Sequence, residues 1–180
     1  MKSLLTTITL TLSCLFLLQS DLAAQQFPAI DKSPADISTF RVNKQAVAKI
    51  VYSRPQKNGR EIFGSLVPYD KIWRTGANEC TEITFYKDVI FGGQEVKAGT
   101  YALFTIPGKE KWTIILNKAF NQWGSYGYDP AEDVCRFDAA VQETPEMVEA
   151  FAIIFFESEN GAQMIMAWDK TMVPVPIEVK

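Results

Sequence analysis

The chain contains no histidine. That absence excludes Ser–His–Asp and Cys–His catalytic triads, imidazole general bases and zinc sites that use histidine ligands. The sequence also has no Asp-rich loop with EF-hand spacing, the pattern by which carboxylates and carbonyl groups bind calcium. We therefore predict no cofactor and no metal site.

Cysteine is scarce as well, with three residues in a chain of 180. Cys14 falls in the N-terminal targeting segment described below, which leaves Cys80 and Cys135. Two cysteines do not make the disulfide framework of a small exported domain. One bridge and two buried thiols are both compatible with the apolar sequence around them.

The N-terminus has the pattern of an export signal. Lys2 gives a short positive region, residues 4–18 form an uncharged apolar and Thr-rich run, and Ala23 and Ala24 are small residues suited to cleavage. The apolar run is too short for a membrane span. We predict a signal peptide at residues 1–24, no membrane span, and an exported protein located in the periplasm or at the outer envelope.

Positive charge is also in short supply. The net charge is −3, so the chain lacks the basic surface needed for bulk nucleic-acid binding. Residues 53–79 nevertheless carry five Lys and Arg against three Asp and Glu, a net of +2, whereas residues 132–159 carry eight acidic residues and one basic residue, Arg136. The basic segment is expected either to hold an anion or to pair with the acidic segment.

Short strand patterns separated by turn residues dominate the rest of the chain, and no convincing amphipathic helix occurs. The expected strands lie at residues 39–42, 46–52, 81–86, 89–91, 94–97, 100–106, 111–117, 134–141, 148–157, 162–168 and 173–179. This pattern predicts an all-β fold, a single antiparallel β-sandwich of about ten short strands with a long irregular insertion. We assign residues 25–38 to a loose N-terminal lead-in and residues 39–180 to the sandwich domain.

Turn residues predict where the chain reverses. Residues 43–44 (Asn-Lys) and 92–93 (Gly-Gly) predict two-residue hairpin turns, and residues 160–161 (Asn-Gly) predict a type I′ turn. Pro174 and Pro176 cannot donate backbone hydrogen bonds to a sheet, so we expect the last strand at a sheet edge.

The long insertion, residues 53–79, carries polar and aromatic residues that the strands lack. Arg74 offers a planar fork that suits a carboxylate or a phosphate, and Gly76 allows a ligand to approach closely. The alternative is a structural corner in which Trp73 caps the core and Arg74 pairs with Glu79 or Glu82.

A second irregular stretch, residues 118–133, has three rings and three glycines or small residues within residues 123–128. Rings on such a loop can stack on a sugar or on another flat apolar face. The alternative is an Ω-loop packed by its own aromatic side chains.

We expect these two stretches to meet at one end of the sandwich and to form a non-catalytic binding site for a small polar or anionic ligand or a glycan. The expected ligand-binding residues are Arg54, Arg60, Trp73, Arg74, Asn78, Glu79, Trp123 and Tyr126. One alternative is a hydrolase in which Glu79 or Asp133 acts as acid or base and Arg74 stabilises developing charge. The other is a structural or interaction protein of the cell envelope.

Several segments resemble one known family. They read YSRP at 52–55, LVPY at 66–69, WRTGANE at 73–79, AGTYALFTIPG at 98–108 and QWGSY at 122–126. In this order they are similar to an uncharacterised family of exported bacterial proteins, catalogued as domain of unknown function 2911. The resemblance implies a secreted or periplasmic protein of Gram-negative type and supplies no activity, ligand or catalytic residue.

Overall fold

The computed structural model describes residues 27–180, so the predicted signal peptide and its cleavage site lie outside the described residues. All the strands belong to one compact unit, Lys32–Lys180. They are β1 (Ala35–Val42), β2 (Gln45–Ser53), β3 (Thr81–Phe85), β4 (Val89–Phe91), β5 (Gln94–Val96), β6 (Gly99–Ile106), β7 (Lys111–Asn117), β8 (Asp133–Ala140), β9 (Gln142–Ser158) and β10 (Gly161–Val179). One short 3₁₀-helix, η2 (Pro130–Glu132), precedes β8.

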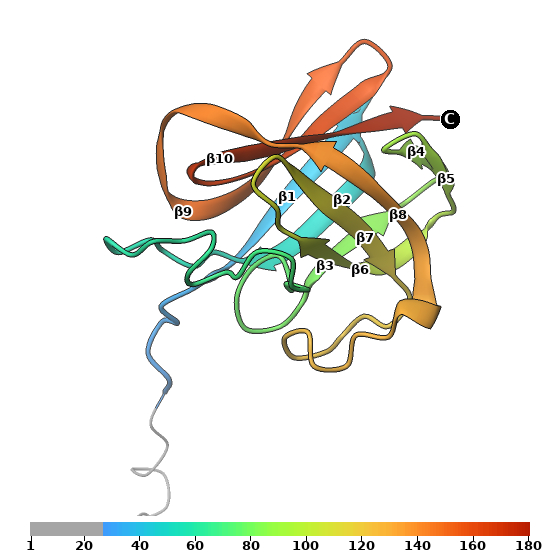
Figure 1. Ribbon diagram of the computed structural model, residues 1–180. Coiled ribbons are helices and arrows are strands. Elements are labelled where there is room, and N and C mark those ends of the chain that lie inside the picture. The colour runs from blue at the N-terminus through green and yellow to red at the C-terminus, as the bar shows by residue number, and fades with distance from the viewer. Residues whose placement is uncertain (1–26) are drawn as a thin grey trace, which may run out of the picture. The chain divides into compact units, whose positions relative to one another are not determined.

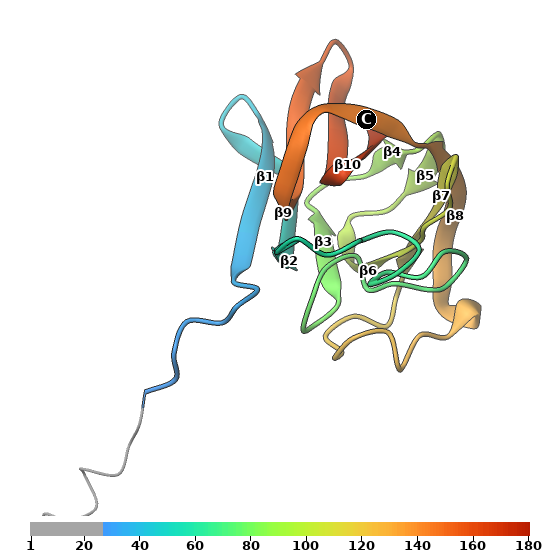
Figure 2. The same cartoon turned by 60° about the vertical axis from the view of Figure 1, so that its left-hand side comes forward.

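These strands form two antiparallel sheets that pack together. The six-stranded sheet has the order β1-β2-β3-β6-β7-β8, and the four-stranded sheet has the order β5-β4-β10-β9. In Figures 1 and 2, β9 and β10 (orange to red) lie across one side of the larger sheet. The predicted all-β antiparallel sandwich is confirmed.

Strand β10 folds back on itself. A straight strand of 19 residues would span about 60 Å at 3.3 Å per residue, yet the two ends of β10 are in contact. The Val179 N–H donates to the carbonyl of Asn160 at 3.1 Å, and Asp169 has a φ of +56° where the chain reverses. The two short strands predicted at residues 162–168 and 173–179 are therefore the two arms of β10, and Figure 1 shows the reversal.

The hairpin predictions have mixed outcomes. Both central residues have positive φ at residues 43–44 and at residues 92–93, as the two-residue turns require. The type I′ turn predicted at residues 160–161 is wrong, because Ser158 pairs with Gly161 and the loop consists of residues 159–160, neither with positive φ. Gly161 is needed for another reason: a Cβ there would lie 1.9 Å from the carbonyl oxygen of Ile177 in the returning arm.

The two ends of the strand series also bear on the sequence predictions. Strand β1 begins at Ala35 rather than at residue 39, so the end of the predicted lead-in at residues 25–38 is strand, paired with β2. The last arm of β10 pairs with β4 at Ile177–Val179, whereas the pairing of β10 with β9 ends at Met172, so both prolines lie beyond the ladder with β9. A proline can occupy this position because it keeps its carbonyl acceptor: the oxygen of Pro176 accepts the N–H of Gly92 at 2.9 Å.

The core lies between the two sheets and extends to one end of the sandwich. Alternating residues of each strand, such as Ile83 and Phe85 in β3 and Met164 and Met166 in β10, face inward and are fully buried. A second small cluster lies on the outer face of the six-stranded sheet, where Phe104 and Ile115 are covered by Ile72 and Tyr128 from the two irregular stretches. The irregular stretches are therefore packed segments.

The two cysteines lie in different clusters, which explains why both are free. Cys135 belongs to the core between the sheets, whereas Cys80 belongs to the cluster on the outer face. Burial raises the pKa of both thiols, that of Cys135 to about 11, although backbone hydrogen bonds partly oppose the shift.

We expect neither Cys80 nor Cys135 of the native protein to react with iodoacetamide at pH 8, because the thiolate is the reactive form and both side chains are inaccessible. Both should become fully alkylated in 6 M guanidinium without reductant. Peptide mass spectrometry of the two samples would measure this for each residue. A bridged Cys80–Cys135 peptide in the unreduced sample would contradict the structure.

Candidate functional site

The insertion between β2 and β3 is fastened to the sandwich at several points along its length. Isolated bridges join Gln56 to Ala150 of β9, and Trp73 to Thr105 of β6. The backbone N–H and carbonyl of Trp73 both pair with Thr105, at 2.8 and 3.0 Å. The green insertion and the gold stretch before β8 lie at the same end of the sandwich in both views (Figures 1 and 2).

The two irregular stretches meet at that end. Glu79 forms an antiparallel bridge with Trp123, and flanking bonds run from the Gly124 N–H to the Asn78 carbonyl at 3.0 Å and from the Cys80 N–H to the Gln122 carbonyl at 2.9 Å. The structure thus brings residues 78–80 and 122–124 together as a short ladder. This contact joins the two segments that the sequence singled out for ligand binding.

Trp73, by contrast, is a core residue. Only 8% of it is exposed, and its ring centroid lies 5.1–6.2 Å from those of Phe63, Trp112, Phe151 and Trp168. Its indole N–H donates to the Gly76 carbonyl at 3.1 Å. The structural alternative, in which Trp73 caps the core, is the arrangement found.

The side chains of Arg54 and Arg60 both donate hydrogen bonds to backbone carbonyl groups. Arg54 forms an ion pair with Asp36 at 3.1 Å, and its Nε donates to the Phe151 carbonyl at 3.0 Å. Arg60 donates through Nε to the Lys57 carbonyl at 2.9 Å, and through Nη2 to a second carbonyl of the same turn. Arg54 therefore links β1 to β9. Arg60, in addition to its backbone bonds, lines a cavity.

Arg74 is different, because within residues 27–180 it forms no ion pair with any acidic residue, including Glu79 and Glu82. Its Nε is buried and has no hydrogen-bond partner among the described residues. A buried N–H without a partner is costly, since it has lost its water without gaining an acceptor. The alternative in which Arg74 pairs with a neighbouring glutamate is therefore not the arrangement found.

The backbone around Arg74 is held rigidly. The Arg74 carbonyl accepts the Thr81 N–H at 3.1 Å, and the buried hydroxyl of Thr81 donates to the Thr75 carbonyl at 2.6 Å. Thr75 is fully buried with a φ of +55°, and its hydroxyl pairs with that of Thr105 at 3.1 Å. Sequence reasoning missed these threonines, since only the pairing of distant segments reveals what they contact.

Arg74 and Arg60 line a shared cavity of about 330 Å³. Residues from the insertion form most of its wall, and Trp168 of β10 closes one side; the lining residues are Ser33, Pro55, Arg60, Leu66, Val67, Trp73, Arg74, Gly76, Ala77, Asn78 and Trp168. Of the described residues that line it, two are arginines and none is acidic. Four of the eight predicted site residues, Arg60, Trp73, Arg74 and Asn78, thus lie on one cavity.

The carboxylates proposed for a hydrolase lie elsewhere. Glu79 and Glu82 line a separate cavity of about 230 Å³ that does not include Arg74. Asp133 accepts hydrogen bonds from Asn117 and Tyr128, both at 2.9 Å, and pairs with Arg136 at 3.4 Å. Asp133 therefore anchors the base of the second irregular stretch, and no acid–base pair of the described residues faces Arg74.

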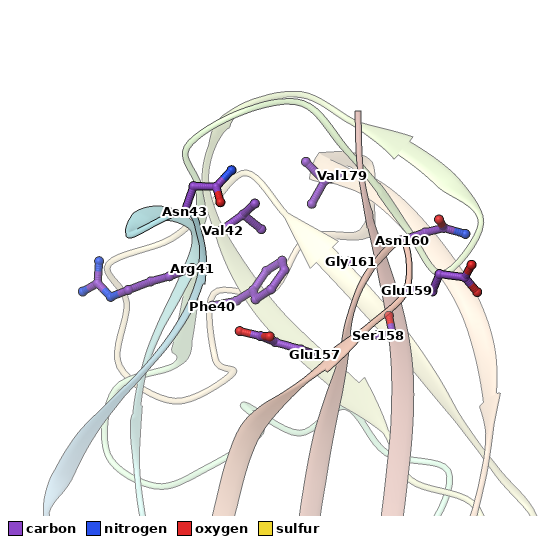
Figure 3. Close-up of a pocket in the computed structure, with 10 residues that line it drawn as sticks. All are labelled: Phe40, Arg41, Val42, Asn43, Glu157, Ser158, Glu159, Asn160, Gly161 and Val179. Atoms are coloured by element: carbon purple, nitrogen blue, oxygen red, sulfur yellow. The ribbon is translucent and has the colours of Figure 1, made fainter.

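A larger cavity of about 430 Å³ lies at the opposite end of β2, between the tips of the β1–β2 and β9–β10 hairpins. Figure 3 shows the ring of Phe40 inside it, Val42 and Val179 on either side, and Glu157 near the ring. The guanidinium of Arg41 and the side chains of Glu159 and Asn160 point away. Its polar groups do not converge, so the Arg60–Arg74 cavity is the better candidate.

The described residues contain neither a metal-binding cluster nor a membrane-spanning helix. Within residues 27–180, no group of three acidic or thiol side chains is arranged to hold a metal ion. The described part of the chain also has no helix of sufficient length and apolar character to cross a membrane.

Comparison with known proteins gives one match. A family model described as "Protein of unknown function (DUF2911)" matches residues 33–177, which confirms the resemblance seen in the sequence. No curated protein and no solved structure matches the chain. The match spans all the strands except the last two residues of β10.

Proposed function

Because the chain belongs to the family of proteins of unknown function DUF2911, we propose a function from the site itself: an exported, non-catalytic module that binds a small anionic ligand at Arg60 and Arg74. Export to the periplasm or outer envelope is part of this proposal, and it rests on the signal pattern of residues 1–24.

The observation that carries the proposal is the cavity wall, which among residues 27–180 contains two arginines and no acidic residue. Guanidinium groups match carboxylate and phosphate groups with two parallel hydrogen bonds. Neither Arg60 nor Arg74 forms an ion pair within residues 27–180, so an anion in the cavity would meet positive charge that no described carboxylate neutralises. Arg60, held by backbone carbonyls of its own turn, adds a second positive charge at a fixed position.

Binding is favoured over hydrolysis by the position of the acids. A hydrolase of the kind considered above needs a carboxylate beside the arginine. Glu79 lines a different cavity, and Asp133 is engaged by Asn117, Tyr128 and Arg136. The chain also has no histidine to act in their place.

The test is anion binding by the mature protein and by the Arg74→Ala variant, measured by calorimetric titration with citrate and with phosphate. We expect the variant to bind the preferred anion about 10- to 100-fold more weakly, because it loses a charge-assisted hydrogen bond. Arg74 makes no ion pair in the described chain, so its loss should leave the circular dichroism spectrum unchanged.

Arg41→Ala is the matched control. It removes the same charge from an exposed position that is not part of the Arg60–Arg74 cavity. Figure 3 shows that the Arg41 side chain also points away from the cavity at the hairpin tips. Equal affinity of the Arg74→Ala variant and the native protein, with both folded, would refute the proposed site.

A further inference from the structure

The Arg74 guanidinium and the exposed ring of Tyr126 both lie close to Gly124 in the second irregular stretch. A Cβ built on Gly124 would lie 3.8 Å from Nη1 of Arg74 and 3.0 Å from Cε2 of Tyr126. The guanidinium and the phenol ring therefore approach the same glycine, whose φ of +66° and lack of a side chain permit this closeness. The site continues from the charged cavity onto the aromatic loop.

The aromatic loop, residues 123–128 of the second irregular stretch, is not packed by its own rings. Tyr128 alone is fastened, with its ring 5.2 Å from that of Phe104 and its hydroxyl bonded to Asp133. Trp123 and Tyr126 are 60% and 88% exposed. Because large rings are normally placed where they can bury their apolar faces, two exposed rings beside a cationic cavity indicate a contact surface.

Hydrogen bonds hold this loop in place before any ligand binds. The side chain of Asn117 accepts the Ala119 N–H at 2.9 Å, and Glu82 accepts the Asn121 N–H at 2.7 Å. The Gly124 N–H is held by the insertion, as described above. A fixed loop lowers the entropy lost on binding, so its rings can act as a preformed platform.

We infer that the ligand is an acidic sugar, a uronic-acid residue of a saccharide, whose carboxylate binds Arg60 and Arg74 and whose ring stacks on Tyr126 and Trp123. The inference rests on the proposed function and specifies its ligand class. A pyranose ring has an apolar C–H face that suits an aromatic ring, and its carboxylate suits a guanidinium. A neutral sugar lacks the carboxylate, and a simple anion lacks the apolar C–H face.

The experiment compares three probes by calorimetric titration of the mature protein: a uronic-acid trisaccharide, tested as the galacturonate and the glucuronate forms, a neutral galactose trisaccharide, and citrate. We expect one of the uronates to bind at least about tenfold more tightly than citrate and than the neutral sugar, since only a uronate can use both halves of the site.

Variants separate the two halves. The double variant Trp123→Ala/Tyr126→Ala should weaken uronate binding by about tenfold or more and leave citrate binding unchanged, whereas Arg74→Ala should weaken both. Tyr126→Phe keeps the ring and should retain affinity. Tyr86→Ala is the matched control, since its ring is also exposed and follows the far end of β3.

The outcomes of these titrations distinguish the acidic-sugar inference from the anion-binding function. If citrate binds through Arg74 but the uronate binds no tighter, or binds equally to the Trp123→Ala/Tyr126→Ala variant, the acidic-sugar inference is wrong and the anion-binding function stands. If neither citrate, phosphate nor the uronates bind the folded protein, both proposals are wrong.

Discussion

Replacing Gly161 with alanine is expected to lower the free energy of unfolding by roughly 3 kcal/mol, because the new methyl group overlaps backbone that cannot move aside. A Cβ at this position would lie 1.9 Å from the carbonyl oxygen of Ile177 and 3.0 Å from the Cα of Glu178. Both belong to the returning arm of β10, which also pairs with β4. The clash therefore separates the two arms or displaces β4.

Urea denaturation followed by circular dichroism would measure this loss as a lower midpoint. Gly59→Ala is the matched control, because Gly59 also has a positive φ (+71°) but a Cβ there would meet nothing within 4 Å. The control should lose only about 1 kcal/mol, from backbone strain alone. Similar losses in the two variants would show that the arms of β10 are not in close contact.

Replacing Trp73 with alanine should cost about 4 kcal/mol, the usual loss when a large buried ring is removed from a well-packed core. Its neighbours are Phe63, Trp112, Phe151 and Trp168, drawn from the insertion and from both sheets. Removing the ring leaves a cavity that none of them can fill, and it also deletes the N–H donor bonded to the Gly76 carbonyl. Trp73 thus supports the ligand site indirectly, by packing the insertion that carries Arg74 against the core.

Trp123→Ala is the matched control for this loss, because the same side chain at an exposed position should contribute less than about 0.5 kcal/mol. Thermal unfolding of the two variants would separate them clearly. A stable Trp73→Ala protein that unfolds like the native chain would mean that the insertion is not part of the core.

The strands were predictable because a period of two residues is a local signal. Ile83 and Phe85 alternate with polar neighbours, and Gly92-Gly93 sets a turn by local conformation alone. The turn prediction at residues 160–161 failed because Gly161 is needed for its close contact with the backbone of Ile177. No local sequence pattern reveals that contact. The same limit applies to β10, whose two arms appear in the sequence as separate strands.

Within the site, residue type alone singled out Arg74, but it did not predict the roles of Trp73 and Trp168. Arg74 stood out because its planar fork is suited to anions, and the structure gives it no acidic partner within residues 27–180. Trp73, adjacent in sequence, faces the core instead, because its backbone pairs with Thr105 of β6. Trp168 was missed, since nothing in the sequence relates β10 to an insertion that precedes it by about half of the chain.

The bridge between the insertion and β9 has a consequence for solubility. Strand β9 ends the four-stranded sheet, and its residues 151–156 (FAIIFF) form an uncharged apolar hexapeptide of the kind that stacks into cross-β fibrils. The Phe151 N–H is bonded to the Pro55 carbonyl at 2.9 Å and the Ile153 N–H to the Tyr52 hydroxyl at 3.0 Å. These donors are unavailable to another chain, so Pro55 of the insertion and Tyr52 of β2 together cover part of this edge of β9.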